Sequence, residues 1–281
     1  MSEIAHASRA LSALGLQALE VASLALPQVK CEVFHRFGPG VYIREVSIPA
    51  NTFAIGHMQK QRHQNIMLRG CVVMFNEDGS TKELRAPLMF VGEPGRKVGY
   101  VTEDMVWLNV YATDETDADK AEALFIDKSE AWLADDVEQR RMASLTKGED
   151  RADYLLALAE TGFTQEQARR QTENTEDQVP FPMGAWPVVV GGSPIEGRGL
   201  FATADIKAGQ VICPARIGDR RTPAGRYTNH AKNPNAAMVA RGHAIALVAL
   251  RDIEGCRGGQ HGEEITVDYR TSIKEARKLA T

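Results

Sequence analysis

Short apolar runs separated by turn residues fill two long stretches of this chain, and a stretch of different composition lies between them. In the first, from about residue 31 to residue 113, such runs are residues 41–48, 66–75 and 105–111. Runs of this length bounded by Gly, Asn, Asp and Pro are typical of β-strands, and several in a row predict a sandwich or a small barrel. The pattern returns, richer in Gly, from about residue 183 to the end. We therefore predict a mainly β, multidomain protein.

The middle stretch, residues 116–174, is dominated by Ala, Leu, Glu, Lys and Arg, which favour helices. Thr164 and Gln167 have the spacing of a capping box at a helix start. The polar, Pro-containing residues 171–182 predict a linker. Candidate buried residues here are Trp132, Leu133, Leu145, Tyr154, Leu155, Leu158 and Phe163. The predicted division is an N-terminal helix over residues 1–28, a first β domain over 29–115, a helical connector and linker over 116–182, and a second β domain over 183–281.

The N-terminal residues 10–26 are apolar and end at Pro27, roughly like the apolar core of a signal peptide. Glu3 precedes them, no basic segment does, and Glu20 interrupts them. We therefore predict an amphipathic docking helix, with a targeting segment as the alternative. The residues expected on its apolar face are Leu11, Leu14, Ala18, Val21 and Ala25.

Charge and cysteine content narrow the functional classes. The 281 residues carry a formal net charge of -4, whereas a nucleic-acid coat is normally basic, so nucleic acid is not an expected partner. No apolar run is long enough to cross a bilayer, so no membrane partner is expected either. The four Cys are scattered without a C-x-x-C pair, which predicts neither a disulfide framework nor a zinc knuckle. A reducing cytoplasm is the expected location.

Four motifs follow one another in the second β stretch. The first is GRGLFA at residues 197–202, with a DIKAG turn shortly after it. The second is RYTNHAKNPN at residues 226–235, and the third is an apolar strand at residues 244–250 that leads into Arg-Asp-Ile. The fourth is GEEITVDY at residues 262–269. Each motif alone is weak, whereas four in a fixed order are specific.

The first motif also fits G-x-G-x-x-A, the dinucleotide-binding pattern, and Asp219 lies at about the distance expected of a ribose-binding acid. That fold requires a helix to begin at the glycines, so that its N-terminus faces the pyrophosphate. Gly209 follows too soon to leave room for such a helix. We therefore set the dinucleotide interpretation aside.

Other polar residues of this stretch have structural interpretations. Asn229 and His230 beside a tyrosine also fit ordinary packing, and Cys256 with His261 supplies too few ligands for a zinc site. A run of arginines fits a solvated surface, with an acidic partner as the alternative. These arginines are Arg216, Arg220, Arg221 and Arg226.

Taken together, the four motifs resemble the SET domain of protein-lysine methyltransferases over about residues 186–270. The resemblance implies a compact β fold in which the second motif threads under the fourth as a pseudoknot, with S-adenosylmethionine as cofactor. It assigns catalysis to Tyr269 and Tyr227, and cofactor binding to Gly197, Arg198, Gly199, Leu200, Asn229, His230 and Tyr269. Two departures concern substrate recognition: residues 212–227 are shorter than the usual insert, and no Cys-rich segment follows Tyr269.

The implied reaction is an in-line displacement, in which the protein mainly aligns donor, methyl and lysine nitrogen. A free lysine has a pKa of about 10.4, so it must lose a proton before it attacks. An apolar, aromatic channel near a cationic sulfonium favours the neutral amine. Tyr269 is then an aligning and electrostatic residue, and no dedicated base is needed.

The first β stretch resembles a cupin. Gly56, His57, Gln59, His63 and Gly70 follow the spacing of the first cupin motif, and residues 92–95 stand where the second motif belongs. A working cupin needs about four ligands, usually three His and a Glu, but Gln59 replaces a His, His63 replaces the Glu, and the late His is missing. We predict a cupin-like jelly-roll barrel without a catalytic metal, the alternative being an atypical site at His57 and His63.

A cupin-like domain joined to a minimal SET domain is similar to the architecture of some bacteriophage-encoded proteins. Two functions follow from the resemblance. One is methyl transfer from S-adenosylmethionine to a lysine of a host or viral protein, in the host cytoplasm. The other is a structural or interaction protein, such as a virion component, whose partners are its own copies or other viral proteins.

Overall fold

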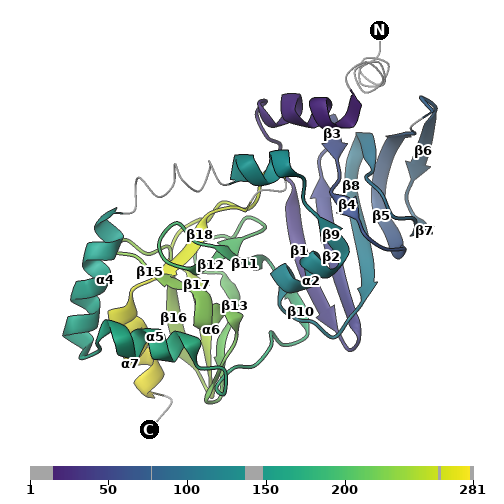
Figure 1. Cartoon of the computed structure of the whole chain (residues 1–281). Helices are drawn as coiled ribbons and strands as arrows, with labels where there is room; N and C mark the ends of the chain where they lie inside the picture. The colour runs from purple at the N-terminus through teal and green to yellow at the C-terminus, as the bar shows by residue number, and fades with distance from the viewer. Residues whose placement is uncertain (1–14, 77, 137–147, 259–260, 279–281) are drawn as a thin grey trace. The chain divides into compact units, whose positions relative to one another are not determined.

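The computed structural model describes residues 15–76, 78–136, 148–258 and 261–278. The chain divides into two compact units (Figure 1). Unit 1 comprises Met1–Glu115, Lys120–Glu138 and Arg257–Gln260, and unit 2 comprises Thr116–Asp119, Gln139–Cys256 and His261–Thr281. Strands dominate both units, which confirms the mainly β, multidomain class.

Antiparallel strands form the sheet of unit 1. Its order is β1 (Glu32–Gly38), β2 (Val41–Ile48), β8 (Val98–Ala112), β5 (His63–Phe75) and β6 (Thr81–Arg85), while β3 (Thr52–Ile55) pairs with β8 and β7 (Leu88–Gly92) pairs with β5. A separate pair joins β4 (Met58–Gln59) to β9 (Ile126–Asp127). The apolar runs found in the sequence lie in β2, β5 and β8. Among the described strands of unit 1, β1 and β6 do not pair with each other, so the predicted barrel is open.

Period-two alternation explains why these segments fold as strands with one buried face. In β1, Val33, His35 and Phe37 are buried and the residues between them are partly exposed. A buried cluster then forms where β5 and β8 pack together. Its members are Met67, Val72, Val101, Met105 and Trp107.

The N-terminal segment is helical over residues 15–24, but its predicted inward face is wrong where the structure describes it. Leu19 and Glu20 are buried instead. The physical reason is an ion pair, because both carboxylate oxygens of Glu20 accept hydrogen bonds from Arg96, at 2.6 and 2.8 Å. That pair fixes the rotation of the helix and turns the predicted face outward. The exposed residues of that face are Ala18, Val21 and Ala25, and its remaining residues, Leu11 and Leu14, lie outside the described part of the chain.

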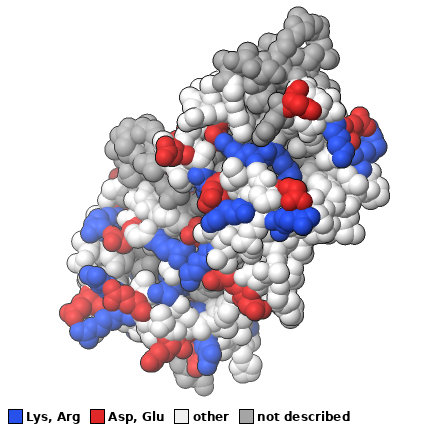
Figure 2. Space-filling view, turned by 45° about the vertical axis from the view of Figure 1, so that its right-hand side comes forward, with Lys and Arg blue, Asp and Glu red and all other residues white. Residues whose placement is uncertain are grey.

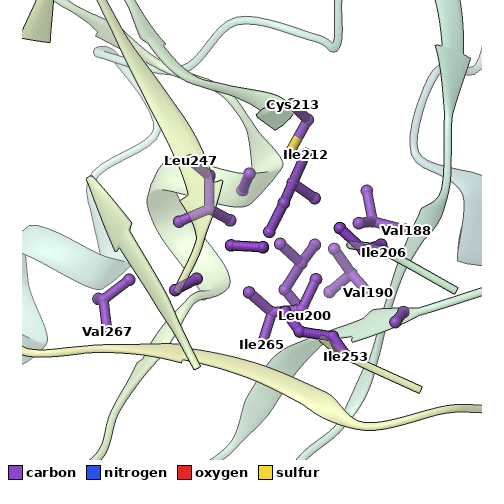
Figure 3. Close-up of a cluster of buried hydrophobic side chains, with 14 of the residues drawn as sticks. Val188, Val190, Leu200, Ile206, Ile212, Cys213, Leu247, Ile253, Ile265 and Val267 are labelled. Carbon is purple, nitrogen blue, oxygen red and sulfur yellow. The ribbon is translucent and has the colours of Figure 1, made fainter. Parts of the chain in front are cut away.

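Unit 2 contains two small sheets. One has the order β11 (Val188–Gly192), β12 (Arg198–Ala202), β18 (Glu264–Val267) and β15 (Asn229–His230). The other has the order β14 (Arg220–Arg221), β13 (Val211–Ile217), β17 (Ala244–Ala249) and β16 (Ala236–Arg241), and β10 (Gly184–Trp186) precedes both along the chain. The apolar residues of the two sheets meet in one core, in which Leu200, Ile265 and Leu247 are fully buried (Figure 3). Gly197 precedes β12 and Gly199 lies within it, so these glycines lead into a strand and not into a helix, which agrees with setting the dinucleotide fold aside.

Helices flank these sheets: α4 (Gly148–Thr161), α5 (Gln165–Glu173), α6 (Pro223–Tyr227) and α7 (Tyr269–Lys278), while α2 (Ala118–Phe125) begins at the end of unit 2's first segment. The predicted capping box is confirmed at the start of α5, where Thr164 and Gln167 exchange hydrogen bonds of 2.9 and 3.1 Å. The tract predicted as a linker begins inside α5.

The burial of the helical residues follows helix periodicity only in part. Trp132 and Leu158 are buried as predicted, Tyr154 and Phe163 are partly buried, and Leu145 lies outside the described residues. The prediction for Leu133 and Leu155 is wrong, since their exposed fractions are 45% and 42%. In α4 the buried residues are Asp150, Ala157 and Leu158, and the 3.6-residue period places Leu155 beside the face that they form.

Among the described residues, no helix has the length and apolar character needed to span a membrane. Lys and Arg side chains alternate with Asp and Glu over the face shown in Figure 2. The four cysteines are free thiols.

Candidate functional site

The second and fourth motifs meet where β15 pairs in parallel with β18, with Asn229 opposite Thr266 and His230 opposite Val267. The backbone N–H of Tyr269 donates to His230 Nδ1 at 3.2 Å, and the two rings lie edge to face at 5.3 Å. The Tyr269 hydroxyl donates to the carbonyl of Thr228 at 3.2 Å. Residues about 40 positions apart in sequence are thus brought into one cluster.

The side chain of Asn229 braces the first motif against the fourth. Its Nδ2 donates to Glu264 Oε1 at 2.8 Å and to Ser193 Oγ at 3.0 Å, and it lies 3.2 Å from the carbonyl oxygens of Glu196 and Arg198. An amide nitrogen has two N–H groups, so these neighbours use its donors fully. Any contact of Asn229 with a cofactor would therefore involve its backbone or its Oδ1 atom.

The two glycines of the first motif have different surroundings. A Cβ at Gly199 would collide with the carboxylate of Glu264, so that glycine makes room for a buried acid. A Cβ at Gly197 would meet nothing within 4 Å, and the φ of Gly197 is 53°. The open backbone of this loop therefore lies at Gly197, while the side chain of Leu200 lies in the core.

Arg198 and Tyr227 form a stacked pair at the edge of this cluster. The guanidinium of Arg198 lies 4.7 Å from the centre of the Tyr227 ring, and that of Arg226 lies 5.0 Å from it. Arg198 also pairs with Asp119 at 3.1 Å and with Asp117 at 3.7 Å. Its charge is thus balanced by carboxylates and by an aromatic ring.

Helix α4 packs directly on this cluster. His230 Nε2 donates to Asp153 at 2.9 Å, and because Nδ1 accepts from Tyr269, the imidazole is held with its proton on Nε2. Arg270 binds both carboxylate oxygens of Asp153, at 2.8 and 3.1 Å. Arg270 and then His230 lower the pKa of Asp153 to about 2. The Tyr154 ring meets the Tyr269 ring edge to face at 5.9 Å.

Sequence reasoning missed four residues of this cluster: Asp153, Tyr154, Ser193 and Glu264. Glu264 lies inside the fourth motif, and its place in that motif was a signal in the sequence that could have identified it. Asp153 lies 77 residues before His230, and Tyr154 lies 115 residues before Tyr269. No local pattern of α4 points to those contacts.

Two residues of the cupin-like motif in unit 1, Gln59 and His63, lie beside Tyr111. The Tyr111 hydroxyl donates to Gln59 at 2.7 Å. His63 Nε2 accepts from Asn109 at 3.2 Å, and its Nδ1 donates to the Gln61 carbonyl at 3.0 Å. Burial lowers the pKa of His63.

His57, the remaining histidine of that motif, lies apart from these bonds. Its ring meets Trp132 edge to face at 5.3 Å. Burial lowers the pKa of His57 to about 4, so the ring is neutral at pH 7. Within the described ranges, no three His, Cys, Asp or Glu side chains gather closely enough to hold a metal ion.

Comparison with known proteins gives similarity to solved structures alone, since no family model and no curated protein matches the chain. A cupin-2 domain protein from Shewanella frigidimarina is 12% identical with a TM-score of 0.25, over 37% of this chain and 99% of that one. An RmlC-like cupin from Methanocaldococcus jannaschii is 15% identical with a TM-score of 0.25, over 30% of this chain and 82% of that one.

A third structure, FeII HppE, is 10% identical with a TM-score of 0.22, over 26% of this chain and 43% of that one. The match thus spans less than half of that structure. Two of the three are described as cupins, the class that the first β stretch resembles in sequence. At TM-scores this low the likeness carries no inference about activity.

Proposed function

We propose that unit 2 transfers the methyl group of S-adenosylmethionine to a lysine of another protein. The observation that supports this most is the parallel pairing of β15 with β18, which sets His230 against Tyr269. These residues belong to the second and fourth of the four motifs that resemble SET domains. A chance match of short motifs would give no reason for them to converge.

The residues of this cluster suit a cationic sulfonium with a flexible tail. Gly197 offers open backbone, and the carboxylate of Glu264 lies beside Gly199. Gly197, Asn229 and His230 would hold the cofactor mainly through backbone atoms, because protein partners engage the Asn229 amide nitrogen and both imidazole nitrogens. When bound, the cofactor supplies an electrophilic methyl group.

The chain's own part in such a reaction is alignment. Burial raises the pKa of Tyr269, so its hydroxyl keeps its proton and remains a hydrogen-bond donor at neutral pH. The aromatic faces of Tyr269 and Tyr154 favour the neutral form of an incoming lysine, because they exclude water. The lysine proton leaves through water. In this proposal α4 supplies the wall that the short segment before Tyr227 lacks.

A second candidate function rests on the same helix. Asp153 ties α4 to both His230 and Arg270, and Tyr154 packs on Tyr269, so the cluster is also complete as a packing arrangement. A structural or interaction protein that keeps the SET-like fold without turnover would have this feature. The pairing of a cupin-like with a SET-like unit resembles bacteriophage-encoded proteins, which would place the enzyme in the host cytoplasm and the structural protein in a virion.

The test is titration calorimetry of the full chain with S-adenosylmethionine and with S-adenosylhomocysteine, followed by transfer of radiolabelled methyl groups into host-cell lysate. The enzyme proposal expects saturable binding of both compounds and labelling of a protein band whose label is in methyllysine. No binding at millimolar cofactor would end the proposal and favour the structural role. Binding without labelling would leave a cofactor-binding protein that is not a lysine methyltransferase for the tested proteins.

A further inference from the structure

Unit 1 contains a cavity of about 920 Å³. Its apolar walls include Val46, Ile48, Phe53, Val101, Met105 and Trp107. Leu19 and Leu24 of the N-terminal helical segment add to the lining. Sites for small molecules commonly measure about 300–1,000 Å³ and are mostly apolar with a few fixed polar groups, so size and lining both fit such a site.

Three polar atoms of residues that line this cavity are buried without a hydrogen-bond partner: Lys97 Nζ, Trp132 Nε1 and His57 Nδ1. A lysine ammonium and an indole N–H can only donate. Leaving a buried donor unsatisfied costs about 1–3 kcal/mol, and more for a charged group. Two donors without acceptors therefore point to a ligand that brings acceptor oxygens.

Among the charged residues that line the cavity, Lys97 has no carboxylate partner. Arg44 pairs with Glu122 at 2.7 Å, and Glu20 pairs with Arg96 at 2.6 Å. No carboxylate among the described residues pairs with Lys97, and burial lowers its pKa. A carboxylate would balance the charge of Lys97 in these apolar surroundings.

The three unsatisfied groups belong to neighbouring segments. The backbone N–H of Gly56 donates to the carbonyl of Lys97 at 2.8 Å, which places Lys97 beside the residue that precedes His57. The His57 ring in turn contacts Trp132. Since His57 is neutral at pH 7, it adds no charge that would repel the ammonium.

We propose that this cavity binds an apolar molecule that carries a single carboxylate, whose oxygens accept hydrogen bonds from Lys97 Nζ and Trp132 Nε1. The apolar walls hold the body of the ligand, and His57 supplies a further polar contact. This site is independent of the methyl-transfer proposal, because every residue named for it belongs to unit 1.

The test titrates the full-length protein with decanoate and with 1-decanol, which share the alkyl chain but differ in charge. Decanoate should bind more tightly, by about tenfold or more, because a charge-assisted hydrogen bond contributes on that scale. Lys97→Gln should remove this preference and Trp132→Phe should reduce it, while decanol binding stays unchanged. Lys82→Gln, at an exposed lysine of the same unit, is the matched control and should behave as wild type.

Melting curves show that each variant is folded before its affinity is compared, and Lys97→Gln should melt no lower than wild type because the lost amine had no partner. Failure of decanoate to bind at millimolar concentration would overturn the proposal. Equal affinities for decanoate and decanol would also overturn it, as would an unchanged preference in folded Lys97→Gln.

Discussion

Individual residues of one motif serve different purposes in this protein. In the fourth motif, Glu264 accepts from Asn229 and Ser193, whereas Tyr269 packs on His230. The motif pattern alone predicted that Asn229, His230 and Tyr269 belong to one site. It could not predict that the Asn229 amide nitrogen donates its hydrogen bonds to other groups of the protein. Among the acceptors, Ser193 and two backbone carbonyls lie outside the second motif, which contains Asn229.

Tyr269→Phe separates the two candidate functions at this scale. The change removes one hydroxyl, whose hydrogen bond to the Thr228 carbonyl contributes about 1 kcal/mol to stability. In an enzyme, turnover should fall by about 10- to 1000-fold, equal to about 1.4–4 kcal/mol of lost alignment, while cofactor affinity changes little. Methyl transfer and melting curves of both proteins are the measurements. Equal labelling by the two would show that Tyr269 does not align the reaction.

Gly199→Ala tests whether the glycine makes room for Glu264. The new Cβ would collide with the Glu264 carboxylate, and overpacking of this kind costs about 1–3 kcal/mol. Gly199→Ala should therefore lower the melting temperature. In a protein that already carries Glu264→Ala, the same change should lower the melting temperature by less than it does in wild type. Gly197→Ala is the comparison, since its Cβ meets open space and only its positive φ opposes the change. The same loss from Gly199→Ala with and without Glu264 would contradict the steric explanation.

At the scale of secondary structure, the sequence predicted the helical periodicity and the helix cap, but it did not predict which face of each helix packs against the rest of the protein. The capping box of α5 is confirmed because both of its partners lie within one helical turn. The inward face of the N-terminal helix was predicted wrongly, since Arg96, which pairs with Glu20, is 76 residues away. The same limit applies to α4, whose contacts with His230 and Arg270 depend on residues that only the fold brings near.

The attachment of α4 should depend on pH through Asp153. Its pKa is lowered to about 2 by Arg270 and His230, below the value of about 3.9 in an unfolded chain. A lowered folded-state pKa means that the carboxylate adds stability above about pH 4, and that this stability is lost as the pH falls from about 4 toward 2. The neighbouring ionisable groups are Arg270, His230, Glu160 and Asp268.

Melting temperatures of wild type and Asp153→Asn, compared from pH 7 to pH 2.5, measure this contribution. Wild type should melt higher at pH 7, and the difference should shrink below about pH 4. Asp127→Asn, at an exposed side chain of unit 1, serves as the control. A difference that stays constant over the whole range would show that the Asp153 charge does not hold the helix.

At the scale of the whole molecule, the sequence predicted the mainly β class of each unit, but it did not predict whether the sheet of unit 1 closes into a barrel. Alternation and turn residues indicated two β stretches around a helical one, and both units are mainly β. The barrel predicted for unit 1 is an open sheet. Closure depends on pairings between strands far apart in the sequence, which the local alternation of residues does not specify. The cavity of unit 1 and its unsatisfied donors likewise arise from tertiary packing.

The metal content of the purified protein is a prediction for the whole chain. A cupin metal site needs about four ligands, but the side-chain Oε1 of Gln59 accepts from Tyr111 and His63 Nε2 accepts from Asn109. His57 alone would make a weak site. Elemental analysis after dialysis should therefore find well under one equivalent of iron, manganese, nickel or zinc, and His57→Ala should leave that amount unchanged. One retained equivalent that disappears in His57→Ala and in His63→Ala would mean that the side chains rearrange around a metal, and it would replace the carboxylate proposal for this unit with a metal site.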